Sequence, residues 1–370
     1  MKAIICGGGV GGISAGLALQ CLGWDISVYE RAPELRVTGA GLNLWPNAGR
    51  ALKSLGLGSE YEKNSAKIDH FLTVAATGDT LFDRPAQEWD AKYGAHATGI
   101  FRRSLSLMLA EALGWQNIHF SHDLVAFEDS GPSVTCHFAN GTTQAADLLI
   151  GADGIHSGVR RMLFGEISYR ANQHHADRWR GLVRLEDTDF DSTAETEVFG
   201  GASFFGTMAI SDEMGYWFAS GPDMKTVEDF MERFCSWDAT HVPKTIAATI
   251  DGQILRTELF DLAELPQSWS KGRVTLLGDA AHPMMPDMAQ GASQTFVDSV
   301  ALGEALKNAA TVEDGIALYE DWRRPAAYRV VHLSRRGMFR DVDDRPKEAG
   351  DVDPISLRYE RDVEEQDVHA

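Results

Sequence analysis

A glycine-rich run near the start of the chain, Gly7–Gly12, restricts the possible folds more than any other feature. It follows a short apolar run, Lys2–Cys6, and precedes a segment with helical spacing, Ile13–Leu22. A second apolar run, Asp25–Tyr29, then ends at Glu30. A strand, a glycine-rich turn, a helix, a second strand and an acid in this order predict a βαβ unit that binds a dinucleotide.

Each glycine of this run has a physical task in such a unit. Gly7 allows the tight turn, Gly9 lets a pyrophosphate approach the backbone, and Gly12 lets the helix pack closely on the strand. Glu30 lies 18 residues after Gly12 and can accept two hydrogen bonds from a ribose. An acid at this place disfavours a 2′-phosphate, so the site suits FAD or NAD better than NADP. The alternative is a glycine-rich turn that holds no ligand.

A second glycine-bounded loop lies far along the chain, between Gly278 and Ala292. An apolar run, Val274–Leu277, precedes the loop, and a helical pattern, Phe296–Leu306, follows it. The carboxylate of Asp279 can accept hydrogen bonds from sugar hydroxyls. The free amides where the helix begins can hold a developing negative charge. The sequence therefore predicts an anion- and diol-binding corner.

Two further glycine-containing loops carry polar side chains. In the loop Gly151–Arg160, Ser157 can cap the next helix, and Asp153 can order a network around a pyrophosphate. The alternative is a plain strand–turn–helix corner. The loop Gly39–Asn47 contains Asn43, whose side chain can cap the turn.

The overall charge excludes some partners. The chain has 34 basic and 54 acidic residues, a formal charge of −20, which disfavours nucleic acid and anionic membranes. No run approaches the roughly 18 apolar residues of a membrane span, and the N-terminus lacks a signal-peptide pattern. The cysteines show no metal-ligand spacing, so we expect no metal site and a cytoplasmic protein with reduced thiols: Cys6, Cys21, Cys136 and Cys235.

Together, the motifs Gly7–Gly12, Gly151–Arg160 and Gly278–Ala292 resemble those of the FAD-dependent, single-component (class A) aromatic hydroxylases. This flavoprotein monooxygenase family includes salicylate, 6-hydroxynicotinate and urate hydroxylases, and the resemblance extends to about residue 340. It implies an α/β fold of the para-hydroxybenzoate hydroxylase type, with a Rossmann-like FAD-binding domain, an inserted antiparallel β-sheet substrate domain and C-terminal helices. The domain bounds that we expect are 1–70, 97–168 and 271–340 for FAD, 71–96 and 169–270 for substrate, and 341–370 for an acidic tail.

The family resemblance also implies the cofactors, namely bound FAD with NADH or NADPH as a transient co-substrate. Arg102 precedes the helical pattern Ser104–Leu113 at the family's offset, although the acid usual two residues later is Ser104 here. A surface arginine is the alternative. The cofactor-binding residues that the resemblance implies are Gly7, Gly9, Val10, Gly11, Gly12, Glu30, Arg31, Gly41, Asn43, Arg102, Leu124, Asp153, Asp279, Pro286, Gly291 and Ala292.

The activity implied is hydroxylation of an aromatic or N-heteroaromatic ring by NAD(P)H and O₂ through a flavin C4a-hydroperoxide. The candidate catalytic residues are Asp287, Tyr216, Asn43 and Pro286. Asp287 or Tyr216 would orient the substrate or accept its proton, or Asp287 is only a loop carboxylate. We expect His282 to be structural rather than a base. Side chains that either line an aromatic pocket or belong to the core are Phe204, Met208, Tyr216 and Trp217.

Other functions remain open. A flavin-dependent epoxidase or Baeyer–Villiger oxygenase would share the motifs, and a non-catalytic NAD-binding regulatory protein would use Gly7–Glu30 alone. A halogenase normally carries a Trp-x-Trp-x-x-Ile segment, which this sequence lacks, and a disulfide reductase needs a reactive cysteine pair. We expect a monomer or homodimer. Helical patterns at 313–324 and 325–339 predict two helices before the tail.

Overall fold

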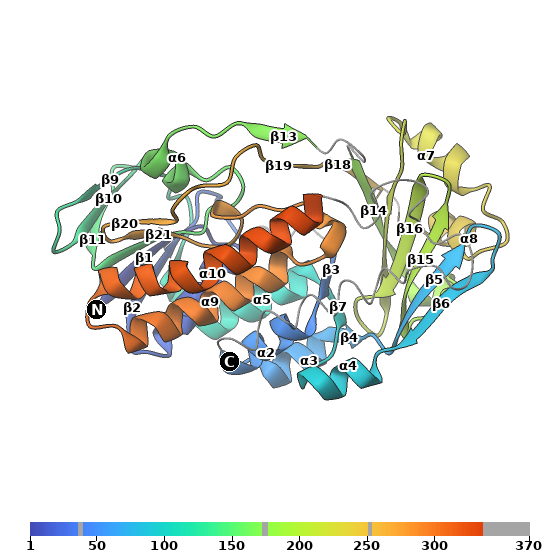
Figure 1. The fold of residues 1–370 in the computed structure, drawn as a ribbon, viewed down its shortest axis with the longest axis horizontal. Helices are drawn as coiled ribbons and strands as arrows, with labels where there is room; N and C mark the ends of the chain where they lie inside the picture. The colour runs from blue at the N-terminus through green and yellow to red at the C-terminus, as the bar shows by residue number, and fades with distance from the viewer. Residues whose placement is uncertain (36–39, 172–176, 251–253, 336–370) are drawn as a thin grey trace.

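The computed structural model describes residues 1–35, 40–171, 177–250 and 254–335. A six-stranded sheet surrounded by helices forms one half of the molecule, and a seven-stranded sheet forms the other half (Figure 1). The chain passes between the two halves several times, so each half is assembled from separate segments.

The six-stranded sheet is built around β1 (Lys2–Cys6), which lies parallel to both β2 (Asp25–Tyr29) and β12 (Leu148–Gly151). These strands are almost entirely apolar because helices or strands cover both faces of a parallel sheet. The helix α1 (Val10–Gln20) connects β1 to β2, which is the predicted βαβ arrangement. The remaining strands of this sheet are β21 (Val274–Leu276), β20 (Ser270–Lys271) and β8 (Ile118–His119).

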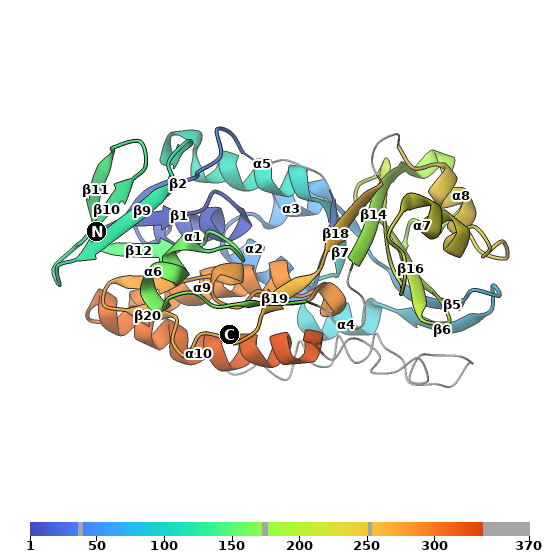
Figure 2. The ribbon, with the colours of Figure 1, turned by 90° about the horizontal axis from the view of Figure 1, so that it is seen from above.

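Three helices pack around α1 and the sheet: α5 (Arg102–Leu113), α9 (Gly291–Asn308) and α10 (Val312–Arg335) (Figure 2). The helices α1 and α9 approach closely because small residues lie between them. The hydroxyl groups of Ser14 and Ser299 are 2.7 Å apart. The loop Gly278–Ala292 therefore leads into α9, and α9 packs directly on α1, the helix that follows the glycine-rich run Gly7–Gly12.

The prediction of two helices near the C-terminus was wrong. Residues 312–335 form a single helix, α10, with Pro325 in its interior. Proline removes one backbone hydrogen bond and normally breaks or kinks a helix. Here buried residues on both sides of Pro325, Tyr319 and Ala327, belong to the same hydrophobic core and keep the two halves of the helix packed on it. Residues 336–339 of the predicted helix lie outside the described residues.

The seven-stranded sheet has the strand order β18-β14-β17-β16-β15-β5-β6 and is antiparallel apart from the parallel pair β15–β5. Strands from the two expected substrate segments pair with each other in this sheet, and the division of the chain into domains stays a prediction. The strands are β5 (His70–Ala75), β6 (Thr80–Pro85), β14 (Asp177–Arg184), β15 (Ala194–Gly200), β16 (Ser203–Ala209), β17 (Met214–Ser220) and β18 (Leu255–Glu258).

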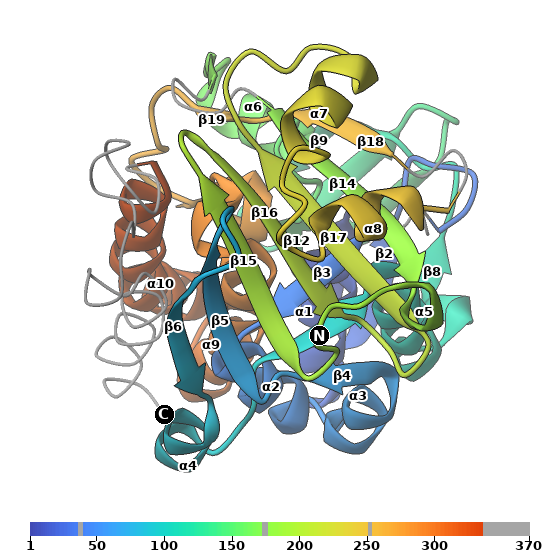
Figure 3. The same ribbon diagram turned by 90° about the vertical axis from the view of Figure 1, so that its right-hand side faces the viewer.

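The two faces of this sheet have different coverings. The outer face is covered by α7 (Val227–Phe234) and α8 (Val242–Ala247), whose apolar side chains pack on it (Figure 3). Trp217, for which either a pocket or a core position is expected, belongs to this outer face and is fully buried in the core. Neighbouring residues of a strand point to opposite faces, so Trp217 and Tyr216 cannot line the same pocket.

Smaller elements connect the two halves. In the described parts of the chain, none of the helices combines the length and apolar character needed to cross a membrane. The strands between the halves are β3 (Gly41–Leu44), β4 (Ser65–Lys67), β7 (Thr98–Phe101), β13 (Tyr169–Ala171) and β19 (Phe260–Leu262). A separate three-stranded sheet lies at the far end of the six-stranded half and consists of β9 (Leu124–Asp129), β10 (Val134–Phe138) and β11 (Thr143–Ala146) (Figure 1). The shorter α-helices are α2 (Pro46–Ser54), α3 (Gly58–Asn64), α4 (Gln87–Tyr93) and α6 (Gly158–Phe164).

Candidate active site and cofactor cavity

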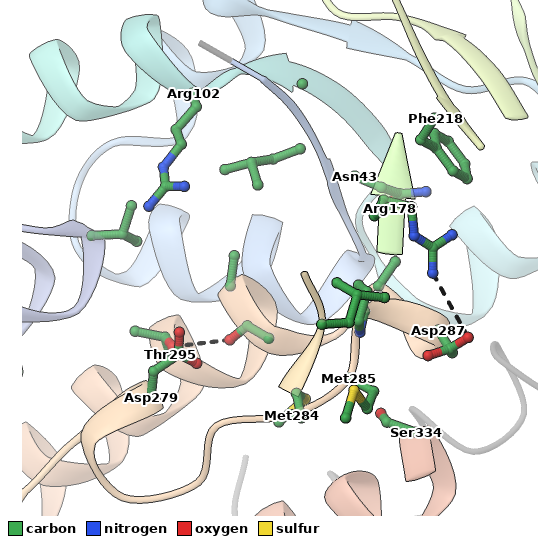
Figure 4. Close-up of a pocket in the computed structure, with 18 of the residues that line it drawn as sticks. Asn43, Arg102, Arg178, Phe218, Asp279, Met284, Met285, Asp287, Thr295 and Ser334 are labelled. Carbon is green, nitrogen blue, oxygen red and sulfur yellow. Dashed lines mark hydrogen bonds and ion pairs between the residues drawn. The ribbon is translucent and has the colours of Figure 1, made fainter. Parts of the chain in front are cut away.

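A cavity of about 470 Å³ lies between the helical half and the seven-stranded sheet. Two loops line it: the glycine-rich run Gly7–Gly12, here called the first corner, and the turn around Asp279, here called the second corner. The lining residues are Gly9–Gly11, Leu277–Asp279, and Gly291 and Ala292 where α9 begins. Figure 4 shows Asp279 and Thr295 on one side of the cavity and Arg178 and Asp287 on the other. The two corners that are distant in the sequence therefore face the same space.

The glycines of the first corner are required for three different reasons. Gly7 has a φ of +112°, and an added Cβ would lie 2.3 Å from the carbonyl oxygen of Ala152. A Cβ on Gly12 would lie 1.8 Å from the carbonyl oxygen of Gly7, so only glycine fits there. A Cβ on Gly9 would meet no atom within 4 Å, because this residue faces the cavity. This open backbone surface fits the close approach of a pyrophosphate.

The carboxylate of Glu30 is fixed by hydrogen bonds to the backbone around the glycine-rich run Gly7–Gly12. Its two carboxylate oxygens accept hydrogen bonds from the backbone N–H groups of Gly8, at 2.7 Å, and Ala32, at 2.8 Å. Each oxygen keeps lone-pair capacity for a ribose hydroxyl. Glu30, the exposed Arg31 and Leu124 at the start of β9 lie outside the cavity lining, and their contacts with the adenosine part of FAD stay predictions.

Asp153 orders the turn of the middle motif through its carboxylate. It accepts hydrogen bonds from the N–H groups of Gly158, at 2.7 Å, and Val159, at 3.2 Å, and from the Ser157 hydroxyl. The Oγ of Ser157 caps α6 by accepting a hydrogen bond from the N–H of Arg160, as expected. The neighbours of Asp153 on either side, Ala152 and Gly154, line the cavity.

Asp279 is the carboxylate of the second corner, and its side chain faces the cavity from the 3₁₀ turn Gly278–Ala280. Asp279 is accessible from the cavity, but the surrounding protein still shields its carboxylate from bulk water and raises its pKa, and the charges of His282, Arg102 and Arg160 partly oppose that rise. Arg102 lines the same cavity (Figure 4). The carboxylate of Asp279 and the guanidinium of Arg102 therefore both line this end of the cavity.

The sheet side of the cavity contains a buried ion pair that the sequence analysis did not identify. Nη2 of Arg178 lies 3.7 Å from Oδ1 of Asp287, and the guanidinium also stacks over the ring of Phe204 at 4.8 Å. Burial lowers the pKa of Arg178, and Asp287 opposes that shift. The sequence signal that could have predicted Arg178 as a cavity residue is the alternation along β14, which places Arg178 and Arg180 on the same face of the sheet.

Aromatic rings form much of the cavity wall on β16 and β17. Phe204, Met208, Tyr216 and Phe218 all line the cavity, and Phe218 was the member that the analysis did not single out. The ring of Tyr216 packs on Gly41, where an added Cβ would lie 2.4 Å from its Cγ. Burial raises the pKa of Tyr216, against the opposing charges of Arg180 and Arg178.

Asn43 and Pro286 complete the set of predicted catalytic residues, and both line the cavity. The side-chain N–H of Asn43 donates to the buried carboxylate of Glu195 on β15 and so connects the two halves of the molecule. Pro286 is exposed to the cavity and starts a 3₁₀ turn that holds Asp287. Sequence reasoning also missed Glu195 and Ser334, which lies at the end of α10.

His282 does not line the cavity. It is completely buried, its ring packs on Trp269, and its Nε2 lies 2.6 Å from Oδ2 of Asp298. This position agrees with the expected structural role. Within the described ranges, no group of three or more His, Cys, Asp or Glu side chains is placed to hold a metal ion.

Comparison with known proteins agrees with this geometry. Residues 1–334 match the family described as "FAD binding domain". The chain is 32% identical over 346 residues to the aurachin C monooxygenase/isomerase of Stigmatella aurantiaca, covering 91% of this chain and 88% of that protein. It is also 32% identical over 361 residues to the 6-hydroxynicotinate 3-monooxygenase of Pseudomonas fluorescens, covering 92% of each.

The fold is similar to those of solved flavoproteins. Klebsiella pneumoniae HpxO, complexed with FAD and uric acid, superposes with a TM-score of 0.84 at 24% identity, over 100% of this chain and 91% of that chain. The tetrameric form of 2-methyl-3-hydroxypyridine-5-carboxylic acid oxygenase superposes with a TM-score of 0.77 at 25% identity, over 90% and 89%. The chain therefore belongs to the FAD-dependent, single-component aromatic hydroxylases and is a flavoprotein monooxygenase with the para-hydroxybenzoate hydroxylase-like fold.

Proposed function

We propose that the protein uses NAD(P)H and O₂ to hydroxylate a small aromatic or N-heteroaromatic substrate in this cavity. The observation that carries the proposal is the continuity of the cavity. It runs from the backbone at Gly9 and the carboxylate of Asp279 to the aromatic and charged wall of the seven-stranded sheet. A dinucleotide bound at the first end would place its reactive ring near the second end, where a flat substrate has aromatic neighbours.

The cofactor contributes the redox chemistry, and the protein contributes position and electrostatics. Bound FAD would supply the oxygen-transferring C4a-hydroperoxide that the family resemblance implies. Gly291 and Ala292 line the cavity where α9 begins, and the N–H groups of this first helical turn would stabilise negative charge on the nearby ring. Pro286 would restrict the space over the reacting edge and help to exclude water.

The substrate would lie between this edge and the rings of Phe204 and Phe218. Asp287 is the candidate acceptor for a proton from a substrate hydroxyl or ring N–H, and Arg178 would hold that carboxylate in place. The names of two relatives support a ring of this kind, because one is a 6-hydroxynicotinate 3-monooxygenase and one is a urate hydroxylase. Tyr216 and Asn43 would orient the ring rather than transfer the proton.

The test is a screen of aromatic acids, phenols and hydroxylated N-heteroaromatic rings for stimulation of NADH and NADPH oxidation. We expect a true substrate to stimulate oxidation and to gain the mass of one oxygen atom. Ring products would distinguish hydroxylation from an epoxide or a Baeyer–Villiger ester. Stimulation without any oxygenated product, for every compound that stimulates, would contradict the proposal.

Asp287→Asn provides the second test, in stopped-flow measurements with the substrate that the screen identifies. The amide keeps the shape of the side chain but cannot accept the proton. We expect flavin reduction to keep its rate while the hydroxylation step slows by about 100-fold, within the range for general base catalysis. An unchanged hydroxylation rate in Asp287→Asn would remove Asp287 from its assigned role.

A further inference from the structure

A buried network of charged and amide side chains lies directly behind the cavity wall. Its centre is the carboxylate of Asp298 in the middle of α9, which is completely buried. The carboxylate accepts hydrogen bonds from Nε of Arg323, at 2.8 Å, from the backbone N–H of Gly278, at 3.1 Å, and from Nε2 of His282, at 2.6 Å. Gly278 lines the cavity, so only one peptide unit separates Asp298 from it.

The other arm of Arg323 leads to the first turn of α9. Its Nη2 donates to Oε1 of Gln294, and Nε2 of Gln294 donates to Oε1 of Gln290 at 3.2 Å. Nδ2 of Asn47 on α2 donates to the same oxygen, also at 3.2 Å. A guanidinium can only donate, so it fixes the orientation of the Gln294 amide and, through it, that of Gln290. Gln290 immediately precedes Gly291, where α9 begins.

The network therefore joins two cofactor-facing elements, the turn that holds Asp279 and the start of α9. The charges of the network affect the pKa of Asp279, which lines the cavity. The charge of His282 lowers the pKa of Asp279, and the charge of Asp298 raises it. Burial alone would raise the pKa of Asp298, but interactions with His282 and Arg323 lower it overall, which keeps Asp298 ionised beside a permanently cationic Arg323. Tyr319 of α10 lies within the field of the same pair and of Glu320.

We propose that Asp298 and Arg323 form a balanced buried charge pair that sets the reduction potential and affinity of the bound FAD, with both residues acting as positioning residues behind the cavity wall. This proposal rests on the assignment of FAD to the cavity. Reduced FAD is more negative than oxidised FAD. A positive charge left unbalanced behind the wall would therefore favour the reduced form, and an unbalanced negative charge would favour the oxidised form.

Opposite single substitutions test the charge pair with no need to know the substrate. Asp298→Asn leaves Arg323 unbalanced, and we expect the preference for reduced over oxidised FAD to rise about tenfold, equivalent to a potential about 30 mV more positive for a two-electron couple. Arg323→Met leaves Asp298 unbalanced, and we expect a change of similar size in the opposite direction. Asp298→Asn/Arg323→Met should return to within about threefold of the wild-type value.

The measurements are reductive titration against a reference dye and titration of the apoprotein with oxidised FAD, both at pH 8.5 to disfavour proton uptake by imidazoles. Glu304→Gln is the matched control, because Glu304 pairs with Lys307 on the exposed side of the same helix, and we expect no change in its potential. If Asp298→Asn does not fold, Arg323→Lys and Arg323→Met remain. The lysine should keep the wild-type potential and the methionine should lower it.

A purely structural role predicts a different pattern, in which both single variants lose FAD affinity equally in the two redox states. That result, or shifts of the same sign in both variants, would overturn the proposal. The outcome is independent of hydroxylation. Unchanged potentials in variants that bind FAD would contradict the charge pair alone, whereas a wild-type protein that binds no FAD would contradict the proposed function itself.

Discussion

The cavity lies between the start of α9, here called the α9 wall, and the seven-stranded sheet, and the buried arginines on these two sides differ in how fully they are hydrogen-bonded. Behind the α9 wall, Arg323 donates through both Nε and Nη2, to Asp298 and Gln294. On the seven-stranded sheet, Arg178 is equally buried, but within the described residues its Nε and Nη2 have no hydrogen-bond partner. The carboxylate oxygen with which it forms an ion pair, Oδ1 of Asp287, lies beyond hydrogen-bonding distance at 3.7 Å from Nη2.

This difference indicates which side of the cavity suits the bound cofactor and which suits the substrate. Leaving a buried donor unsatisfied costs about 1–3 kcal/mol, and more for a charged group. A wall whose charged side chains are hydrogen-bonded, as Arg323 and Asp298 are, is already organised, as a permanently bound cofactor requires. A wall with unsatisfied donors is stabilised when a ligand supplies hydrogen-bond acceptors, or when small side-chain movements bring acceptors of the protein within reach. We therefore expect substitutions at the α9 wall and first corner to affect folding and FAD, and substitutions on the sheet to affect the substrate.

The largest effect should come from a pair of glycine substitutions in the first corner. Gly12→Ala places a Cβ 1.8 Å from a backbone oxygen, which cannot move aside, and we expect a loss of at least about 3 kcal/mol of unfolding free energy. Gly9→Ala, its matched control, has open space and should lose less than about 1 kcal/mol while weakening FAD binding. Chemical denaturation and flavin fluorescence measure the two quantities. Equal stability of the two variants would contradict the close packing seen at Gly12.

Asp279→Asn should separate stability from cofactor affinity. Loss of the charge-assisted hydrogen bonds should weaken FAD binding by about 10- to 100-fold. The raised pKa of Asp279 means that the unfolded chain releases this proton more readily than the folded protein, so ionisation favours unfolding above the ordinary aspartate pKa.

The Asp279→Asn apoprotein should therefore be more stable than the wild type at pH 7, and the gain should disappear as the pH falls below about 4. Thermal melts of the two apoproteins across this range provide the measurement. Stabilisation that persists unchanged at low pH would show that ionisation of Asp279 is not its cause.

Arg178→Met tests the sheet side of the comparison. Methionine fills part of the space but removes the donors, so we expect KM for the substrate to rise about tenfold or more. FAD affinity should stay within about twofold of the wild type, as measured by titration of the apoprotein. Arg184→Met, on the same strand but exposed at its end, serves as the control and should leave both quantities unchanged. Loss of FAD from Arg178→Met would break the proposed division between the walls.

The smallest effect should come from Tyr216→Phe. The pKa of Tyr216 is raised above its ordinary value of 10.0, so the hydroxyl stays protonated between pH 6 and 9 and contributes no titration there. We expect kcat to fall by no more than about threefold and the pH profile to keep its shape, since a single neutral hydrogen bond contributes about 1 kcal/mol. A limb of the profile that disappears in Tyr216→Phe would show that this hydroxyl titrates in the active protein.

The two walls also differ in how far the sequence predicted them. The first corner, the second corner and the start of α9 follow from local patterns, since a strand, a glycine and a helix start are short-range features. Trp217 was expected either in the pocket or in the core, and the strand alternation, which places it on the face opposite Tyr216, would have selected the core. Arg178 and Glu195 could not be paired with Asp287 and Asn43 from the sequence, because strand order and register are long-range properties.

The parallel pairing of β5 with β15 affects how such a protein can be altered. Four of the seven strands of this sheet, β14 to β17, are continuous in the chain, but β5, which pairs with the other edge of β15, and β6 beyond it come from residues 70–85. Transplanting residues 177–220 from a relative would therefore join a foreign β15 to a resident β5. Exchange of substrate preference between relatives should require both segments together, and hybrids that carry only one should be the poorly folded members of any chimeric library.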